Sequence, residues 1–286
     1  TVGCTNVFGS SQQSINVNRG NPPVVAITAP ADGLNTTATS VNVAYTVDGA
    51  SSIPGNATCT VAGNASSSTT TNSASLVMGA NTITVVCTNP FGNDTKSITV
   101  NRGVPPTVAI TAPADGLNTT ATSVNVAYTV NGLTSIPSGH NCTVNGAASS
   151  SASSNSVALS LGANTITVFC VNVFGNGSAQ ITVNRGNPPV VAITSPADGL
   201  NTTASSVNVT YSVNGGGSIP GNTSCTVGGA SSTSTSTNSF ALSMGANTIS
   251  VTCTNPFGFD TKQVTVNRGV PPTVAITAPA NLAHTV

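Results

Sequence analysis

The sequence predicts an all-β protein built from tandem β-sandwich domains of 83 residues each. The first observation is an internal repeat, because Cys4, Cys87, Cys170 and Cys253 follow one another every 83 residues, as does the tetrapeptide Val-Ala-Ile-Thr. The second is composition: Val, Thr, Asn and Ile abound while Glu is absent, which disfavours long helices. The third is the position of turn-forming residues, since Gly, Pro and Asn separate short segments of alternating polarity.

The repeat divides the chain into three whole units and two partial ones. The whole units are 21–103, 104–186 and 187–269, preceded by the C-terminal part of a repeat (1–20) and followed by the N-terminal part of another (270–286). Units that begin Asn-Pro-Pro-Val-Val alternate with units that begin Val-Pro-Pro-Thr-Val. We therefore interpret the sequence as a window on a longer tandem array with a two-unit superperiod.

Within 21–103 we expect six or seven short strands, the number typical of a β-sandwich. The clearest alternates over 40–47, where Val41, Val43, Tyr45 and Val47 share one face. The other expected strands are 24–28, 58–61, 76–78, 82–88 and 96–100. Turns are expected at 32–33, 79–81 and 89–92, where Asp-Gly, Gly-Ala-Asn and Asn-Pro-Phe-Gly occur.

Three segments of the middle unit carry a family resemblance: Pro-Pro-Thr-Val-Ala-Ile-Thr-Ala-Pro-Ala-Asp-Gly (105–116), Cys-Thr-Val-Asn-Gly (142–146) and Gly-Ala-Asn-Thr-Ile-Thr-Val (162–168). They resemble bacterial immunoglobulin-like repeats of surface adhesins and extracellular fibre proteins. The resemblance implies tandem immunoglobulin-like sandwiches, a module that serves as spacer, stalk or ligand platform. Two departures stand out: the sequence has no Trp, and its cysteines fall on the expected strands C and F rather than B and F.

Each whole unit contains two cysteines 28 positions apart, on strands that we expect to be neighbours. The spacing lacks accompanying His and any Cys-x-x-Cys, so it favours one disulfide per domain over zinc, with buried thiols as the alternative. The expected pairs are Cys59 with Cys87, Cys142 with Cys170, and Cys225 with Cys253. Cys4 has no partner in this window, and an intermolecular bridge is the other reading of it. Disulfides would imply an oxidising compartment.

The junctions between units are short and contain Pro, so a stiff rod is expected. We predict that an Asp after the first strand and an Arg at the end of the last strand brace each junction, against the alternative of two solvated charges. We also predict that a Phe on a turn faces the preceding unit as a wedge, rather than completing its own core. The predicted junction residues are Asp32, Arg102, Asp115, Arg185, Asp198, Arg268, Phe91, Phe174 and Phe257.

Charged residues make up only 4% of the chain, with Lys+Arg and Asp+Glu equal at 6 each. This composition argues against nucleic-acid binding and against membrane insertion in this segment. The two histidines, His140 and His284, lie outside the repeated pattern and have no acid or nucleophile at a motif spacing. Two or so Asp in each unit are too few for a calcium site. We therefore expect no metal, no cofactor and no enzymatic activity.

Sequons for N-glycosylation occur at about the frequency that chance predicts for a chain so rich in Asn, Ser and Thr. Asn35, Asn118 and Asn201 are the better candidates because they share a turn-like Asn-Thr-Thr. Polar tracts at 66–71, 149–154 and 231–237 either carry O-glycans or form polar edge strands.

Together these features favour a structural role: the repeat region of a secreted or cell-surface fibre or adhesin, forming a disulfide-stapled rod or filament shaft. Its expected partners are copies of itself or neighbouring repeats of a longer chain. The alternative is an immunoglobulin-like module that binds carbohydrate or another surface, with host or surface glycans as partners. That alternative is weakened because Tyr45, Tyr128 and Tyr211 fall on the inward face of a strand. Either role places the chain outside the cell.

Overall fold

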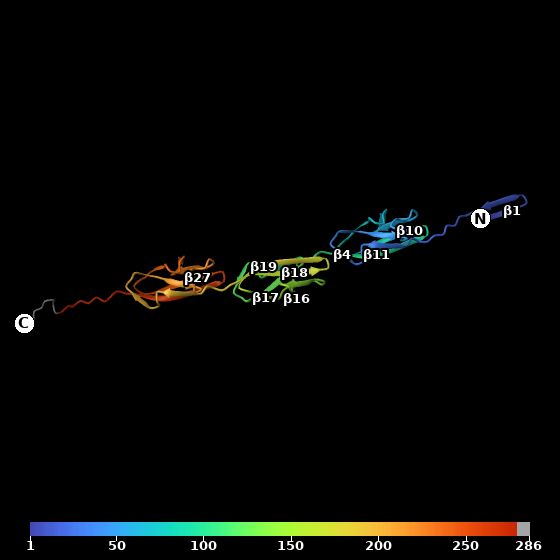
Figure 1. Cartoon of the computed structure of the whole chain (residues 1–286). Coiled ribbons are helices and arrows are strands. Elements are labelled where there is room, and N and C mark those ends of the chain that lie inside the picture. Colours follow the sequence, from blue (N-terminus) through green and yellow to red (C-terminus); the bar gives the residue numbers. More distant parts are fainter. Residues whose placement is uncertain (279–286) are drawn as a thin grey trace, which may run out of the picture.

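The computed structural model describes residues 1–278, which form strands, turns and loops; His284 lies outside this range. Figure 1 shows three β-sandwiches following one another in a line, with an isolated hairpin before the first. That hairpin consists of β1 (Val2–Asn6) and β2 (Gly9–Gln13), and all its residues are exposed. Within residues 1–278 no helix has the length and hydropathy needed to cross a membrane.

The first sandwich has a five-stranded sheet of order β4-β11-β10-β7-β8, faced by the ladders β3-β6 and β5-β9. Its long hairpin, β10 with β11, pairs continuously from Gly79 opposite Arg102 to Asn89 opposite Gly92. The short strand β4 runs parallel to β11, the last strand. The strands are β3 (Val25–Ala29), β4 (Leu34–Thr36), β5 (Ser40–Asn42), β6 (Ala44–Val47), β7 (Thr58–Val61), β8 (Asn64–Ser66), β9 (Ser73–Ser75), β10 (Gly79–Asn89) and β11 (Gly92–Arg102).

The second sandwich repeats this plan, with a five-stranded sheet β13-β19-β18-β15-β16 facing the three-stranded sheet β12-β14-β17. One continuous strand, β14, replaces the interrupted pair β5 and β6 of the first sandwich. The strands are β12 (Val108–Ala112), β13 (Leu117–Thr119), β14 (Ser123–Val130), β15 (Asn141–Val144), β16 (Ala147–Ser149), β17 (Asn155–Ala158), β18 (Gly162–Asn172) and β19 (Gly175–Arg185).

The third sandwich returns to the pattern of the first, with the sheet β21-β28-β27-β24-β25 facing the ladders β20-β23 and β22-β26. The strands are β20 (Val191–Ser195), β21 (Leu200–Thr202), β22 (Ser206–Asn208), β23 (Thr210–Val213), β24 (Ser224–Val227), β25 (Ala230–Ser232), β26 (Ser239–Ala241), β27 (Gly245–Asn255) and β28 (Gly258–Arg268). The first and third sandwiches thus match each other more closely than either matches the second, as the sequence alternation predicts.

Each sandwich encloses its own core between the two sheets, formed by alternate residues of its strands. In the first sandwich, Val43, Tyr45 and Val47 of one sheet meet Ile83 and Val85 of the other, and all five side chains are buried. Val, Ile and Cys provide most of each core, which agrees with the β-branched, aromatic-poor composition. The all-β sandwich fold expected from the sequence is confirmed.

Two expectations for the segment before β10 are wrong. The strand expected at 76–78 lies at 73–75 instead, and β10 begins at Gly79, inside the expected turn. The side chain of Asn81 explains the difference, because its Oδ1 accepts from Val77 N and its Nδ2 donates to Val77 O, each at 2.8 Å. Asn81 therefore shapes the bend while its own backbone is already in the ladder.

Candidate functional site at the junctions

The turn between the last two strands of each sandwich is built around an Asn and a Phe. In the second sandwich Asn172 Oδ1 accepts a hydrogen bond from Phe174 N at 2.9 Å, which closes a local turn. The Nδ2 of the same Asn donates to Val104 O at 3.0 Å. Asn89 binds Asn21 O and Asn255 binds Asn187 O in the same way, each at 2.9 Å. One amide thus ties this turn to the chain that enters the sandwich.

The Phe of this turn lies against the glycine that ends the preceding repeat. A Cβ added to Gly103 would collide with the ring of Phe174, and one added to Gly186 would collide with Phe257. Phe91 has the same relation to Gly20. Each ring therefore covers a linker residue outside its own strands, and its role as a wedge stays a prediction.

The same glycine is held by the sandwich that it leaves. Gly103 N donates to Thr36 O at 3.0 Å and Gly186 N donates to Thr119 O at 3.0 Å, which continues the parallel ladder by one bond. Beyond it, Pro105 lies against the turn, because a Cβ on Gly175 would be 2.9 Å from Pro105 Cγ. Every residue from Gly103 to Pro105 is therefore bonded to, or in contact with, one sandwich or the other.

A cleft of about 430 Å³ lies between the first and second sandwiches. Met78, Asn101 and Arg102 line it from the first sandwich, and His140 and Phe174 from the second. His140 Nε2 lies 3.2 Å from Asn172 Nδ2, and His140 Nδ1 lies 3.2 Å from Ser138 O. His140 thus braces the Asn that holds the turn.

The predicted Asp residues form hydrogen bonds within their own sandwiches. Asp32, Asp115 and Asp198 each accept from the backbone N of a residue on the last strand, at 2.7 Å. They lie near the outgoing end, as expected, and fix the turn before the parallel strand. The two ion pairs within residues 1–278 are Lys96–Asp94 and Lys262–Asp260.

The predicted Arg residues also bond within their own sandwiches. The Nη1 of Arg102, Arg185 and Arg268 donates to Leu76 O, Leu159 O and Leu242 O, at 3.3, 3.1 and 3.0 Å. Arg102 in addition lines the cleft shared with the second sandwich. A bracing role for these Asp and Arg residues across the junctions stays a prediction.

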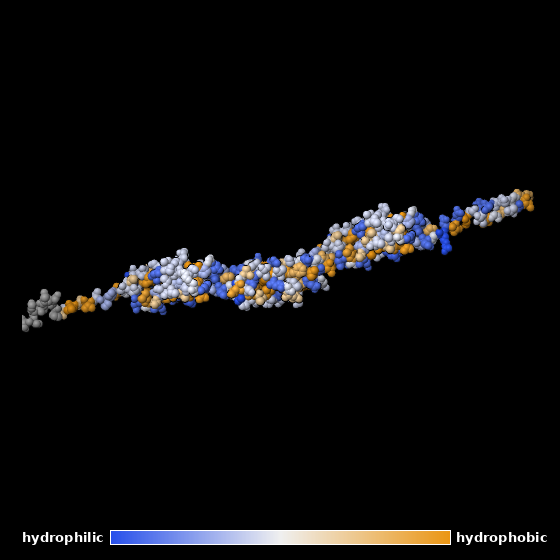
Figure 2. Space-filling model, viewed as in Figure 1, coloured by the Kyte–Doolittle hydropathy of each residue, from blue (hydrophilic) through white to orange (hydrophobic). Residues whose placement is uncertain are grey.

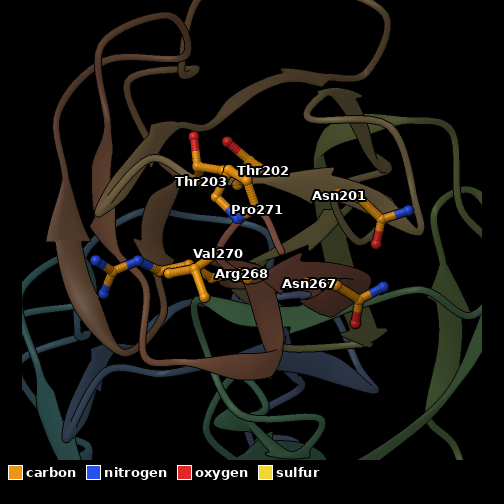
Figure 3. Close-up of a pocket in the computed structure, with 8 residues that line it drawn as sticks. Asn201, Thr202, Thr203, Asn267, Arg268, Val270 and Pro271 are labelled. Atoms are coloured by element: carbon orange, nitrogen blue, oxygen red, sulfur yellow. The ribbon is translucent and has the colours of Figure 1, made fainter. Parts of the chain in front are cut away.

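The glycosylation candidates lie at the outgoing ends on the parallel edge strand. Asn35, Asn118 and Asn201 are exposed. Figure 3 shows Asn201 beside Asn267, its register partner, while Arg268 extends away from both. These residues line a hollow of about 580 Å³ with Thr202 and Pro271. The position leaves Asn201 accessible to modification, which stays a prediction for all three sites.

Each sandwich contains one disulfide, with the pairing expected from the spacing. Cys59–Cys87, Cys142–Cys170 and Cys225–Cys253 each join residues directly opposite on neighbouring strands, with Cα atoms 4.1 Å apart. The bridge therefore lies within the five-stranded sheet rather than between sheets. Cys4 on β1 is exposed and unpaired. The three disulfides indicate an oxidising environment.

Each sandwich also contains a partly buried polar network that was not predicted from the sequence. Tyr45 OH lies 2.7 Å from Ser66 Oγ, which also lies 2.7 Å from Asn72 Oδ1, and Asn72 Nδ2 donates to Val43 O. The equivalent groups are Tyr128, Ser149 and Asn155, and Tyr211, Ser232 and Asn238. The recurrence of Tyr, Ser and Asn at fixed offsets was the available signal. The serine of this network is the first residue of the tracts at 66–71 and 149–154 and the second residue of the tract at 231–237.

An aspartate on the last strand distinguishes the first and third sandwiches from the second. Asp94 Oδ2 accepts from Val25 N and Asp260 Oδ2 from Val191 N, both at 2.8 Å. These backbone hydrogen bonds, opposed by partial desolvation and aided by the neighbouring Lys, lower the pKa of both carboxyls below the ordinary value of 3.8. The second sandwich has Gly177 here, where a Cβ would collide with Pro106 O.

No protein-family model matches the chain, and no curated protein is similar to it in sequence. Among solved structures, three titin domains (I67–I69) align at 14% identity over 88% of this chain and 100% of theirs, with a TM-score of 0.47. Immunoglobulin domains 1–5 of Sidekick-1 align at 11% identity over 85% of this chain and 58% of theirs, with a TM-score of 0.37. The eight N-terminal domains of Down Syndrome Cell Adhesion Molecule align at 12% identity over 87% and 37%, with a TM-score of 0.39. The sandwich fold itself is established by the strand pairing described above.

Proposed function

We propose that this chain is the repetitive shaft of an extracellular fibre or cell-surface adhesin, in which immunoglobulin-like domains form a stiff, disulfide-stapled rod. The proposed domains are 21–103, 104–186 and 187–269, with parts of further repeats at 1–20 and 270–286. The observation that carries the proposal is the junction, because the linker has no unattached residue between Gly103 and Pro105. Domains joined without slack keep a fixed orientation, which a shaft requires and a flexible spacer does not.

The remaining features support the same role. The disulfides stabilise sandwiches whose cores contain few aromatic side chains. A strictly constant repeat length allows the same Gly, Phe and Asn contacts to form at every junction. The buried tyrosines, each at most 3% exposed, weigh against a sugar-binding platform built on them.

The experiment that tests the rod is small-angle X-ray scattering of the intact chain at low concentration, combined with negative-stain electron microscopy. A strand of 11 residues such as β10 has a length of about 37 Å, so three aligned sandwiches extend over roughly 110 Å. We expect straight particles with at least this length and a narrow distribution of angles between sandwiches. A broad distribution of angles between the sandwiches would contradict the stiff shaft and would indicate a flexible spacer instead.

A further inference from the structure

The five-stranded sheet of each sandwich has an outward face that bears no charged residue. On β11 the residues that alternate with the inward Ile98 and Val100 are Asn93, Thr95, Ser97, Thr99 and Asn101. The Asp and Lys of this strand lie on its other side, where Asp94 receives the hydrogen bond from Val25 N. The corresponding residues of β19 and β28 are also uncharged. We call this surface of the three sandwiches the hydroxyl face.

Polar groups on the hydroxyl face bond to one another across the strands. Thr84 Oγ1 lies 3.0 Å from Ser97 Oγ in the first sandwich, and Thr252 Oγ1 lies 2.9 Å from Thr261 Oγ1 in the third. In the second, Gln180 Nε2 donates to Thr167 Oγ1 at 2.9 Å. Such groups keep further lone pairs or protons for a partner, and a hydroxyl both donates and accepts. A face of this kind is complementary to a copy of itself.

Apolar side chains stand on the same face. Phe169 is 40% exposed and Val171 37% exposed on β18, and Phe259 on β28 is 70% exposed. Large exposed aromatics are typical of surfaces that bind a partner. The outward face of the opposite sheet has only Ala, Ser, Thr and Asn on its strands and is narrower. In the view of Figure 2, much of the third sandwich has the pale colours of intermediate hydropathy.

We propose that two copies of this chain associate side by side through their hydroxyl faces. No like charges meet when these faces approach, and the hydroxyl, amide and aromatic groups of one copy find the same groups on the other. Because the face recurs with every sandwich, a weak contact at one sandwich is multiplied along the rod. The inference rests on the proposed shaft, since only a stiff rod holds successive hydroxyl faces at fixed angles to one another.

The test uses the intact chain with one lysine introduced on the hydroxyl face of each sandwich: Thr84→Lys, Thr167→Lys and Ser250→Lys together. A matched control places three lysines on the opposite sheet: Ser40→Lys, Ser123→Lys and Ser206→Lys, all exposed. Sedimentation equilibrium measures self-association of each protein. We expect the wild-type chain and the control to dimerise and the face variant to associate at least about tenfold more weakly at low salt.

A rescue experiment distinguishes repulsion from misfolding. A second face variant has Glu at positions 84, 167 and 250, and the Lys and Glu variants are mixed at equal concentration. We expect mixed dimers that weaken with added salt, because opposite charges now meet across the interface. A wild-type chain that stays monomeric at millimolar concentration, or a control that dissociates as the face variant does, overturns the inference. If scattering shows straight particles that stay monomeric, the proposed shaft stands and only the proposed side-by-side contact is overturned.

Discussion

Gly103 and Gly186 occupy positions in the junctions where a side chain has no room. Each donates its backbone N–H to the preceding sandwich and is covered by a Phe ring of the next. Neither has a left-handed backbone conformation, so what excludes a side chain here is the ring rather than φ.

We therefore predict that Gly103→Ala displaces Phe174 and loosens the first junction, while both adjoining sandwiches stay folded. Gly269→Ala is the matched control, because it ends the same Asn-Arg-Gly segment and a Cβ there meets nothing within 4 Å. Residual dipolar couplings or scattering of the intact chain measure the spread of angles between the sandwiches. An unchanged distribution in Gly103→Ala would show that the Phe ring does not set the joint.

The first and third sandwiches contain a carboxyl group, Asp94 and Asp260 respectively, at a position where the second has Gly177. Their folded-state pKa lies below 3.8 because each carboxylate accepts a backbone hydrogen bond from the first strand. A depressed folded-state pKa contributes stability that is present above the unfolded-state pKa and is lost as the pH falls through the folded-state value.

Below about pH 5 we expect the melting temperatures of these two sandwiches to fall progressively relative to that of the second. Asp94→Asn with Asp260→Asn is expected to flatten this difference, because the amide keeps an acceptor but does not titrate over this range. Calorimetry of the intact chain from pH 7 to 2 checks the prediction. If the melting temperatures of all three sandwiches fall equally with pH, the loss of stability comes from groups that all three share and not from Asp94 and Asp260.

At the scale of elements, the disulfide of the second sandwich joins the neighbouring strands β15 and β18 of one sheet, at residues directly opposite each other. In the chain-entropy model, closing a loop of this length stabilises the folded domain by about 3.5 kcal/mol. This is a large share of the stability expected for a domain of this size.

We predict that Cys142→Ala with Cys170→Ala lowers the unfolding free energy of the second sandwich by about 3 kcal/mol. The other two sandwiches, which keep their own bridges, provide the internal reference. Urea denaturation followed by residue-resolved NMR assigns each transition to its sandwich. A loss below about 1 kcal/mol would mean that the cross-strand bridge adds little to a ladder already formed.

The elements that sequence reasoning predicted are those with a local signal. Alternation located β6 and β7, and the constant cysteine spacing identified the bridges. The strand β4 was missed because its three residues pair with residues about 66 positions later, which no local pattern encodes. The turn expected at 79–81 was wrong because Gly and Asn there serve a side-chain bend before a strand. The network around Ser66 was missed although Tyr, Ser and Asn recur at fixed offsets, because Tyr45 and Ser66 lie on strands of opposite sheets and 21 positions apart.

At the scale of the whole molecule, the near absence of charge and the repeated junction act together. Repulsion between successive domains is small, so the contact of Phe174 with Gly103 does not have to overcome it. The alternation of sandwiches with and without the Asp–Lys pair marks every second domain.

The parallel pairing of β4 with β11 has a mechanical consequence. The chain enters a sandwich through β3, which leads directly into β4, and leaves it at the end of β11. Tension that is passed on through β3 therefore pulls β4 and β11 in opposite directions along their length. Such a load shears the three register pairs simultaneously instead of opening them one at a time. If the pairing of β4 with β11 breaks, the disulfide between Cys59 and Cys87, which are 28 positions apart in sequence, still keeps the segment between them from extending. Under tension each domain would then lengthen by a limited amount, set by the residues outside the disulfide-closed segment.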